Sequence, residues 1–147
     1  STWAQYMAGV MLQEGQGVPA DYQQAARWYE LAGEAGHLLS LRNLGILLQV
    51  GGHGLARDLG GAFDAYSKAA EAGDTTSAIN AAALALSGEL GVGRYRQASQ
   101  LLISAFMLGD PQAEPLIEQM ISDLGLHPYL ASRLERASSQ FDHRLTA

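Results

Sequence analysis

The chain has 147 residues, of which 48% are hydrophobic and 16% charged, and this length suits one domain with a buried core. Its net charge of −6 and nine scattered Lys and Arg residues argue against a nucleic-acid surface, which needs clustered positive charge. The absence of cysteine excludes disulfides and thiolate chemistry, and no apolar run approaches the roughly 18 residues that a membrane helix needs.

Helical patterns alternate with glycine-rich turns along most of the chain. Apolar residues at helical spacing predict helices over residues 3–14, 21–35, 38–50, 58–72, 74–87 and 94–108. Pro19 lies in the first turn, where it cannot continue a helix. Asp21, followed by Gln24, predicts a helix N-cap with a capping-box partner. These signals predict three pairs of helices.

Two further helices are predicted near the C-terminus. Asp110 and Pro111 predict the cap and the first residue of a helix that ends near residue 123. Pro128 predicts the start of another helix over 127–145, whose apolar stripe is formed by Leu130, Leu134, Ala137, Phe141 and Leu145. A solenoid needs a terminal element with one apolar and one polar face, so we interpret 127–147 as a C-terminal capping helix. The alternatives are a helix for a partner or a second subunit, which would give a homo-oligomer, and a helix on a membrane surface.

The helical patterns return at intervals of 36 or 37 residues. Gly9 and Gly45 are 36 residues apart, whereas Asp21 and Asp58 are 37 apart because the turn at 51–54 contains one extra residue. A regular period of this length indicates an array of helical repeats. We expect one solenoid domain over 1–126, with units at about 3–36, 37–73 and 74–109 and a partial unit at 110–124.

Small and aromatic residues recur at fixed places in these units. In the first unit they are Ala4, Tyr6, Gly9, Gly15, Gly17, Val18, Asp21, Tyr22, Ala25, Trp28, Tyr29, Ala32 and Gly36. In the second they are Asn43, Leu44, Gly45, Gly54, Asp58, Ala62, Tyr66 and 69–73. The third unit departs from the pattern, with Ala82, Arg94 and Leu102 in place of the glycine, the aspartate and the tyrosine. The pattern resembles the Sel1-like repeat, a relative of the tetratricopeptide repeat.

This resemblance implies an all-α fold. It is a right-handed α-solenoid of antiparallel helix pairs, with about three Sel1-like repeats, a fourth first-helix and the C-terminal capping helix. The resemblance also implies that the first helices of the repeats line a concave face. The partner-binding residues expected on that face are Tyr6, Val10, Gln13, Arg42, Asn43, Ile46, Gln49, Ile79, Asn80 and Ala83.

Within this set, Tyr6 and Arg42 are the expected energetic anchors, because aromatic and Arg side chains dominate many interfaces. Polar amides such as that of Asn43 can hold the backbone of an extended peptide. The alternative for Asn43 is a structural bond to a neighbouring helix. Tyr29 and Tyr66 lie on second helices, and we interpret them as packing residues.

The sequence shows no recognisable catalytic or metal-binding constellation. His37, His53, His127 and His143 lack the spacing and the companions of metal ligands. The turn at 51–54 has the composition of an anion-binding nest, but an inserted loop residue explains it better, since the repeat places a turn there. Nucleophile-elbow, P-loop and dinucleotide motifs are absent. We therefore expect that the protein is not an enzyme and that it binds neither a metal ion nor a cofactor.

The sequence thus favours a non-catalytic scaffold or adaptor that binds a partner protein or peptide through the concave face. The resemblance is compatible with a bacterial regulatory, toxin-neutralising or envelope-complex role. One alternative is a module that binds glycans or cell-wall fragments by stacking on Trp3 and Tyr6, although only the first unit supplies such aromatic residues. Another is a purely structural segment of a longer array. The compartment, periplasmic or cytoplasmic, stays open because a targeting segment can have been removed.

Overall fold

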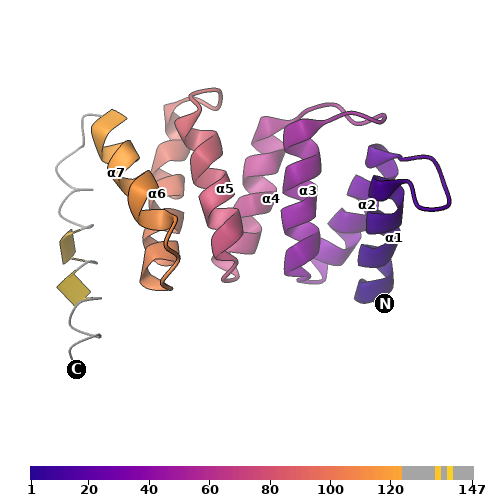
Figure 1. The fold of residues 1–147 in the computed structure, drawn as a ribbon, viewed down its shortest axis with the longest axis horizontal. Helices are drawn as coiled ribbons and strands as arrows, with labels where there is room; N and C mark the ends of the chain where they lie inside the picture. The colour runs from indigo at the N-terminus through magenta and orange to yellow at the C-terminus, as the bar shows by residue number, and fades with distance from the viewer. Residues whose placement is uncertain (124–134, 137–138, 141–147) are drawn as a thin grey trace.

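The fold is a row of helix pairs arranged in two layers (Figure 1). The computed structural model describes residues 1–123, 135–136 and 139–140. Its helices are α1 (Thr2–Glu14), α2 (Tyr22–Glu34), α3 (Leu38–Val50), α4 (Leu59–Glu71), α5 (Thr75–Leu86), α6 (Tyr95–Met107) and α7 (Ala113–Asp123), with a short 3-10 helix, η1 (Val92–Arg94), before α6. Helices α1, α3, α5 and α7 form one layer, and α2, α4 and α6 form the other. Each helix packs on the next along the chain, which confirms the all-α solenoid of helix pairs.

The predicted C-terminal helix over 127–145 lies outside the described residues except for four positions. The capping role of 127–147 therefore remains a prediction.

Most helix ends lie where the sequence predicts them. The carboxylate of Asp21 caps α2 by accepting a hydrogen bond from the backbone N–H of Gln24 at 3.0 Å. The expected capping box is only half formed, because the side-chain amide of Gln24 donates to the same carboxylate, at 2.9 Å, and not to the backbone N–H of Asp21. That N–H donates to the carbonyl of Leu12 instead and so ties the start of α2 to α1.

The start of α7 differs from the prediction. Pro111 was expected as the first helical residue, but the helix begins at Ala113. The carboxylate of Asp110 accepts a hydrogen bond from the N–H of Gln112 at 2.9 Å, and its carbonyl accepts one from the N–H of Ala113. These two bonds stabilise a turn over residues 110–113, and the helix begins only at the end of this turn.

A close contact between a glycine and a tyrosine sets the distance between the two helices of a pair. A Cβ atom on Gly45 of α3 would lie 2.5 Å from Cε1 of Tyr66 on α4, so only glycine fits at this place. The Tyr66 ring is fully buried, and its hydroxyl donates a hydrogen bond to Oε1 of Gln49 at 2.8 Å. The first pair has the same arrangement, formed by Gly9, Tyr29 and Gln13.

The third pair replaces all three of these residues together. Ala82 takes the place of the glycine, and Leu102 that of the tyrosine, and both are fully buried. Leucine is shorter than tyrosine and leaves room for the alanine methyl group. It also has no hydroxyl to satisfy, so Leu86 can replace the glutamine. The departures of the third unit are therefore one coordinated change in packing.

This coupling predicts the outcome of a double-mutant cycle. Gly45→Ala should destabilise the protein by about 1–3 kcal/mol through overpacking against Tyr66, although the same exchange in an open helix stabilises it by about 1 kcal/mol. Gly45→Ala/Tyr66→Leu, which reproduces the third pair, should cost clearly less than the sum of the two single variants. Urea unfolding of the four proteins measures the coupling, and strictly additive free energies would contradict the packing argument.

Candidate functional site

The predicted partner-binding residues lie on α1, α3 and α5, and several of them make contacts inside the protein. Gln13 and Gln49 accept hydrogen bonds from the buried tyrosines. Val10 packs against the core beside Tyr29, and Ile79 is itself buried. Among the remaining residues, Ile46 and Ala83 are exposed, and Asn80 is half-buried.

Asn43 joins two neighbouring repeats. The Tyr29 hydroxyl donates to Oε1 of Gln13 at 2.6 Å, and the Asn43 side chain on α3 hydrogen-bonds to the same hydroxyl. Burial raises the pKa of Tyr29 to about 12, and it likewise raises the pKa of Tyr66 to about 12. A buried hydroxyl needs partners, so the amides of Gln13 and Asn43 are already engaged.

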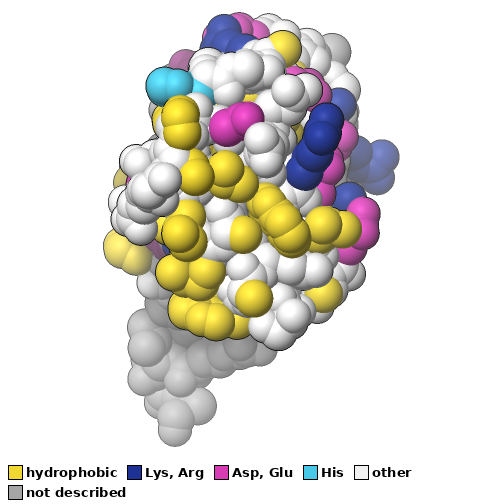
Figure 2. Space-filling view, turned by 90° about the vertical axis from the view of Figure 1, so that its right-hand side faces the viewer, with side chains coloured by type: hydrophobic (Ala, Val, Ile, Leu, Met, Phe, Trp, Pro, Cys, Tyr) yellow, Lys and Arg dark blue, Asp and Glu magenta, His cyan; other side chains and the backbone are white. Residues whose placement is uncertain are grey.

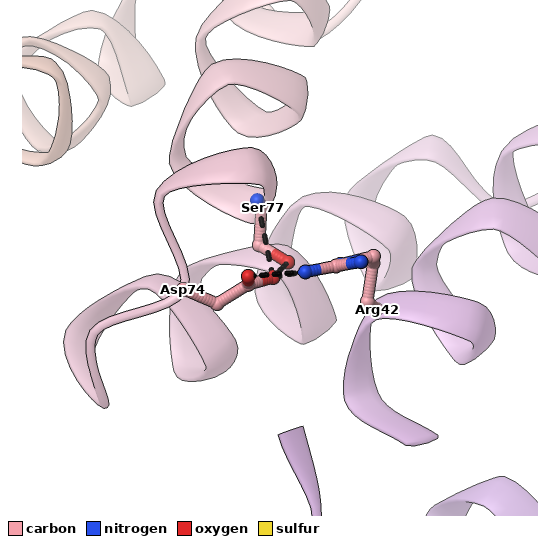
Figure 3. Close-up of polar contacts among 3 residues, drawn as sticks. All are labelled: Arg42, Asp74 and Ser77. Carbon is pink, nitrogen blue, oxygen red and sulfur yellow. Dashed lines mark hydrogen bonds and ion pairs between the residues drawn. The ribbon is translucent and has the colours of Figure 1, made fainter. Parts of the chain in front are cut away.

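The Arg42 side chain also bridges two repeats (Figure 3). Its Nε donates to Oδ2 of Asp74 at 2.9 Å, and its Nη2 binds the other carboxylate oxygen. Asp74 is the N-cap of α5, where it also accepts hydrogen bonds from the backbone N–H and the hydroxyl of Ser77. Burial of the Asp74 carboxyl opposes its ionisation, but the bonds from Arg42 and Ser77 outweigh this effect and lower its pKa below 3.8.

At the junction between the first and second repeats, different side chains occupy the two positions that Arg42 and Asp74 occupy at the next junction. His37 is the N-cap of α3, as Asp74 is of α5, and its Nδ1 accepts a hydrogen bond from the N–H of Ser40. The ring of Tyr6, which lies in the position of Arg42 one repeat earlier, is 4.8 Å from the His37 ring, measured between centroids. Tyr6 and Arg42, the expected anchors of a partner, thus both contact the cap of the next first helix.

The inserted residue in the loop at 51–54 has a structural role that the sequence did not reveal. His53 adopts a positive φ of 45°, and its carbonyl accepts a hydrogen bond from the backbone N–H of Tyr22 at 3.0 Å. Its ring lies 4.7 Å from the Tyr22 ring. Tyr22 is the first residue of α2, where backbone N–H groups lack partners within the helix. The loop reaches back over the top of the first repeat and supplies one (Figure 1).

Exposed apolar side chains form a strip on α3, which we call the α3 strip. It consists of Leu39, Ile46 and Val50, which are 41%, 36% and 66% exposed. Their spacings of seven and four residues place them on one face of the helix. Trp3, in the position of Leu39 one repeat earlier, is also exposed. The residues predicted from the sequence did not include Val50. Its apolar side chain occupies the position that the charged Glu14 has in the first repeat, and this difference was visible in the sequence.

Grooves lie between successive second helices. The larger, of about 620 Å³, is lined by α2, α3 and α4, and its charged residues are Glu30, Glu34, Asp58, Asp64 and Lys68. Two of the carboxylates have structural partners, since Asp58 caps α4 at the N–H of Gly61 and Asp64 pairs with Arg94 at 2.8 Å. Within 1–123 and the four described residues beyond, no group of His, Asp or Glu side chains could hold a metal ion. No helix in this part of the chain combines the length and the apolar character needed to cross a membrane.

Comparisons with known proteins agree with this geometry. Residues 4–37 and 38–74 each match the family model of the Sel1 repeat. No curated protein matches the chain.

Among solved structures, the chain is similar to a protective antigen of uropathogenic Escherichia coli that displays an SLR fold, with a TM-score of 0.71 and 24% identity, over 93% of this chain and 30% of that one. It is also similar to a Sel1 repeat protein from Oxalobacter formigenes, with a TM-score of 0.69 and 27% identity, over 84% of this chain and 50% of that one. The chain thus spans half or less of the length of these structures.

The Arg42–Asp74 pair predicts a pH-dependent contribution to stability. Because the folded pKa of Asp74 is lowered, its stabilising effect is present above the unfolded pKa and is lost as the pH falls from about 4 through the folded value. Asp74→Asn should therefore cost about 1–3 kcal/mol near neutral pH. The cost should shrink below about pH 4, as followed by urea unfolding at several pH values.

Asp64→Asn is the matched control, because it removes an exposed ion pair with Arg94 and should cost less than about 1 kcal/mol. A cost for Asp74→Asn that stays constant from neutral to acid pH would show that the charge of Asp74 is not what stabilises the junction.

The buried tyrosines predict a loss of stability at alkaline pH. The pKa of Tyr66 is about 12 in the folded protein and 10.0 for the free side chain, so stability is lost as the pH rises from 10 toward 12. Between about pH 9 and about pH 11 the wild type should lose about 1 kcal/mol more than Tyr66→Phe, which has no proton to release. Urea midpoints at the two pH values measure the difference. Equal losses in both proteins would contradict the raised pKa.

Proposed function

Since this chain is a Sel1-like repeat protein, we propose that it is a non-catalytic scaffold that binds a partner protein or an extended peptide through the exposed side of its odd-numbered helices. Proteins of this repeat family are generally scaffolds for protein–protein interactions and are typically not catalytic.

The α3 strip is the observation that carries this proposal. Large exposed apolar side chains usually occur singly on a protein surface, and several in line mark an interaction site. Leu39, Ile46 and Val50 follow one face over the whole length of α3, and Trp3 is an exposed apolar residue at the equivalent of Leu39 on α1. Burial of one such side chain in an interface contributes about 1.5–3 kcal/mol. Leu39, Ile46 and Val50 are already partly buried, so a partner that covers the strip would gain part of this free energy from each of them.

Polar groups beside the strip would orient the partner. The Arg42 side chain is 29% exposed even though it is paired with Asp74, so part of it faces solvent. Under this proposal Arg42 and Tyr6 hold the two repeat junctions beneath the surface, while Leu39, Ile46 and Val50 make the main contact. The centre of the site thus moves from the expected anchors to the apolar residues of α3.

The alternative of glycan binding has weaker support. Stacking of a sugar ring needs a free aromatic face, and Tyr6 is surrounded by the rings of Trp3, Tyr29 and His37 at centroid distances of 5.4, 6.1 and 4.8 Å. Trp3 is exposed, but the corresponding residues of the next repeats, Leu39 and Thr76, are not aromatic. Because only one repeat offers an exposed aromatic residue for stacking on a sugar, a protein partner is favoured over a bound polysaccharide.

The source of the similar structures bears on the kind of adaptor. Both similar structures come from bacteria, and one of those proteins is a protective antigen. This origin favours a bacterial adaptor, and a toxin or a component of an envelope complex is the partner class to test first.

Capture of the partner from lysate tests the proposal. Leu39→Ser/Ile46→Ser should reduce retention of a stoichiometric partner protein about tenfold, because the two lost contacts together are worth about 1.4 kcal/mol. Leu108→Ser is the control, since it removes an apolar side chain at the end of α6 that is 66% exposed, more than either Leu39 or Ile46, and it should leave retention unchanged. Circular dichroism verifies that all variants fold.

Retention that is equal in the wild type and the double variant would place the partner elsewhere on the protein. Retention of glycan, with no protein, would favour the alternative function.

A further inference from the structure

The two grooves between successive second helices differ in size and in charge. The groove between α2 and α4 has a volume of about 620 Å³, and the one between α4 and α6 has about 350 Å³. Four carboxylates and the Lys68 ammonium line the first, whereas the described residues that line the second include one charged side chain, that of Glu71. We call the first the acidic groove. Figure 2 shows acidic and basic side chains along the side of the molecule where the second helices lie.

Small residues on α4 leave the acidic groove open. Gly61 and Ala65 line its α4 wall, and their counterparts on α6 are Gln97 and Leu101. The helix cap does not require a glycine at position 61, because Gln24 follows the capping aspartate of α2 at the same place. Glycine also weakens a helix. The open wall is therefore a property of this groove and not of the repeat.

The floor of the acidic groove is apolar. It is formed by Leu41, Leu44 and Leu48 of α3, and the corresponding residues of α5 are all alanines. Binding sites for ligands are typically clefts of about 300–1,000 Å³ with mainly apolar walls and a few polar groups that orient the ligand. The acidic groove has this size and this combination of side chains.

Two carboxylates of the groove are free to bind a ligand. Asp58 caps α4 and Asp64 is paired with Arg94, as described above. Glu30 and Glu34 are exposed, and within the described part of the chain neither of them forms an ion pair, nor does Lys68 on the opposite wall. Residues four apart lie on the same face of a helix, about 6 Å from each other along its axis. Glu30 and Glu34 can therefore bind neighbouring groups of one ligand.

We propose that the acidic groove binds an arginine-containing peptide segment of a partner protein. Four carboxylates against one ammonium group determine that the ligand is positively charged. Guanidinium groups of the segment would pair with Glu30 and Glu34, because arginine binds carboxylates through two parallel hydrogen bonds. The aliphatic part of each arginine would lie on Leu41, Leu44 and Leu48. This apolar floor favours arginine over the more strongly hydrated lysine.

The acidic groove is separate from the α3 strip and does not depend on the proposed function. Successive residues of a helix are turned by about 100°. This rotation places Leu41 and Leu48 on the side of α3 opposite to Leu39 and Ile46. A protein bound to the α3 strip therefore leaves the acidic groove accessible, and the chain can join two different proteins.

Titration with a defined peptide tests the proposal. The probe is a rhodamine-labelled hexapeptide of alternating arginine and leucine, and its anisotropy is followed at low ionic strength, where ion pairs are least screened. Glu30→Gln/Glu34→Gln should weaken binding about tenfold, because two partly exposed ion pairs are lost. Glu114→Gln/Glu118→Gln is the matched control, since it changes the net charge equally at two exposed glutamates four residues apart on α7. It should leave the affinity unchanged.

Gly61→Gln tests the shape of the groove without a change in charge. It places on the α4 wall the side chain that Gln97 has in the smaller groove. Gln24 shows that glutamine fits after a capping aspartate, and glutamine favours a helix more than glycine does, so the urea midpoint should be kept or raised. The affinity for the probe should fall to about that of the Glu30→Gln/Glu34→Gln variant.

Several results would overturn the proposal. The first is a wild type that does not bind the probe, or that binds it no more tightly than Glu30→Gln/Glu34→Gln does. An equal loss in both double variants would show that the probe responds to net charge alone, and full affinity of Gly61→Gln would place the probe outside the groove. Spermine that competes as tightly as the peptide binds would make a small polycation the occupant.

Discussion

The close packing of Gly45 on the Tyr66 ring is the contact on which much else depends. It brings two helices so near that a single methyl group would not fit, and it buries a phenol hydroxyl. An unsatisfied buried hydroxyl costs about 1–3 kcal/mol, so the glutamine one turn further along the first helix must accept its hydrogen bond. One packing choice thus decides the identity of three residues. It also explains why the side-chain amide of Gln49 on α3 accepts a hydrogen bond from a buried tyrosine and is not left for a partner.

The junctions between repeats obey a second constraint of the same kind. In the first two repeats, one residue of the first helix lies close to the cap of the next first helix. It forms an aromatic pair at the first junction and an ion pair at the second. Because Tyr6 and Arg42 are drawn into these contacts, the exposed surface of α3 consists mainly of Leu39, Ile46 and Val50. The polar residues hold the array together, and the apolar residues face outward.

The sequence predicted the architecture well because the repeat fixes local geometry. Helix ends follow caps such as Asp21 and Asp58, whose effect acts over three residues and is visible in the sequence. The site was harder to predict, since a side chain on the outer side of a first helix can turn toward a partner or toward the next repeat. For Arg42 that choice depends on the distance to Asp74, which is 32 residues away in the chain and is set by how the repeats stack. The contact of His53 with Tyr22 depends on the same stacking.

Comparison of the repeats separates two kinds of exposed apolar residue. Met11 has counterparts that are apolar in every repeat and buried wherever a helix precedes, namely Leu47, Leu84 and Met120, so the packing of the repeats explains an apolar side chain at this position. Val50 behaves differently, because its counterparts are Glu14 and Ser87, and nothing in the fold requires an apolar side chain there. An apolar residue that the fold neither needs nor buries is better explained by binding. The packing of the repeats therefore accounts for the apolar side chain of Met11 and not for that of Val50, which is why we propose the α3 strip as the surface for a partner.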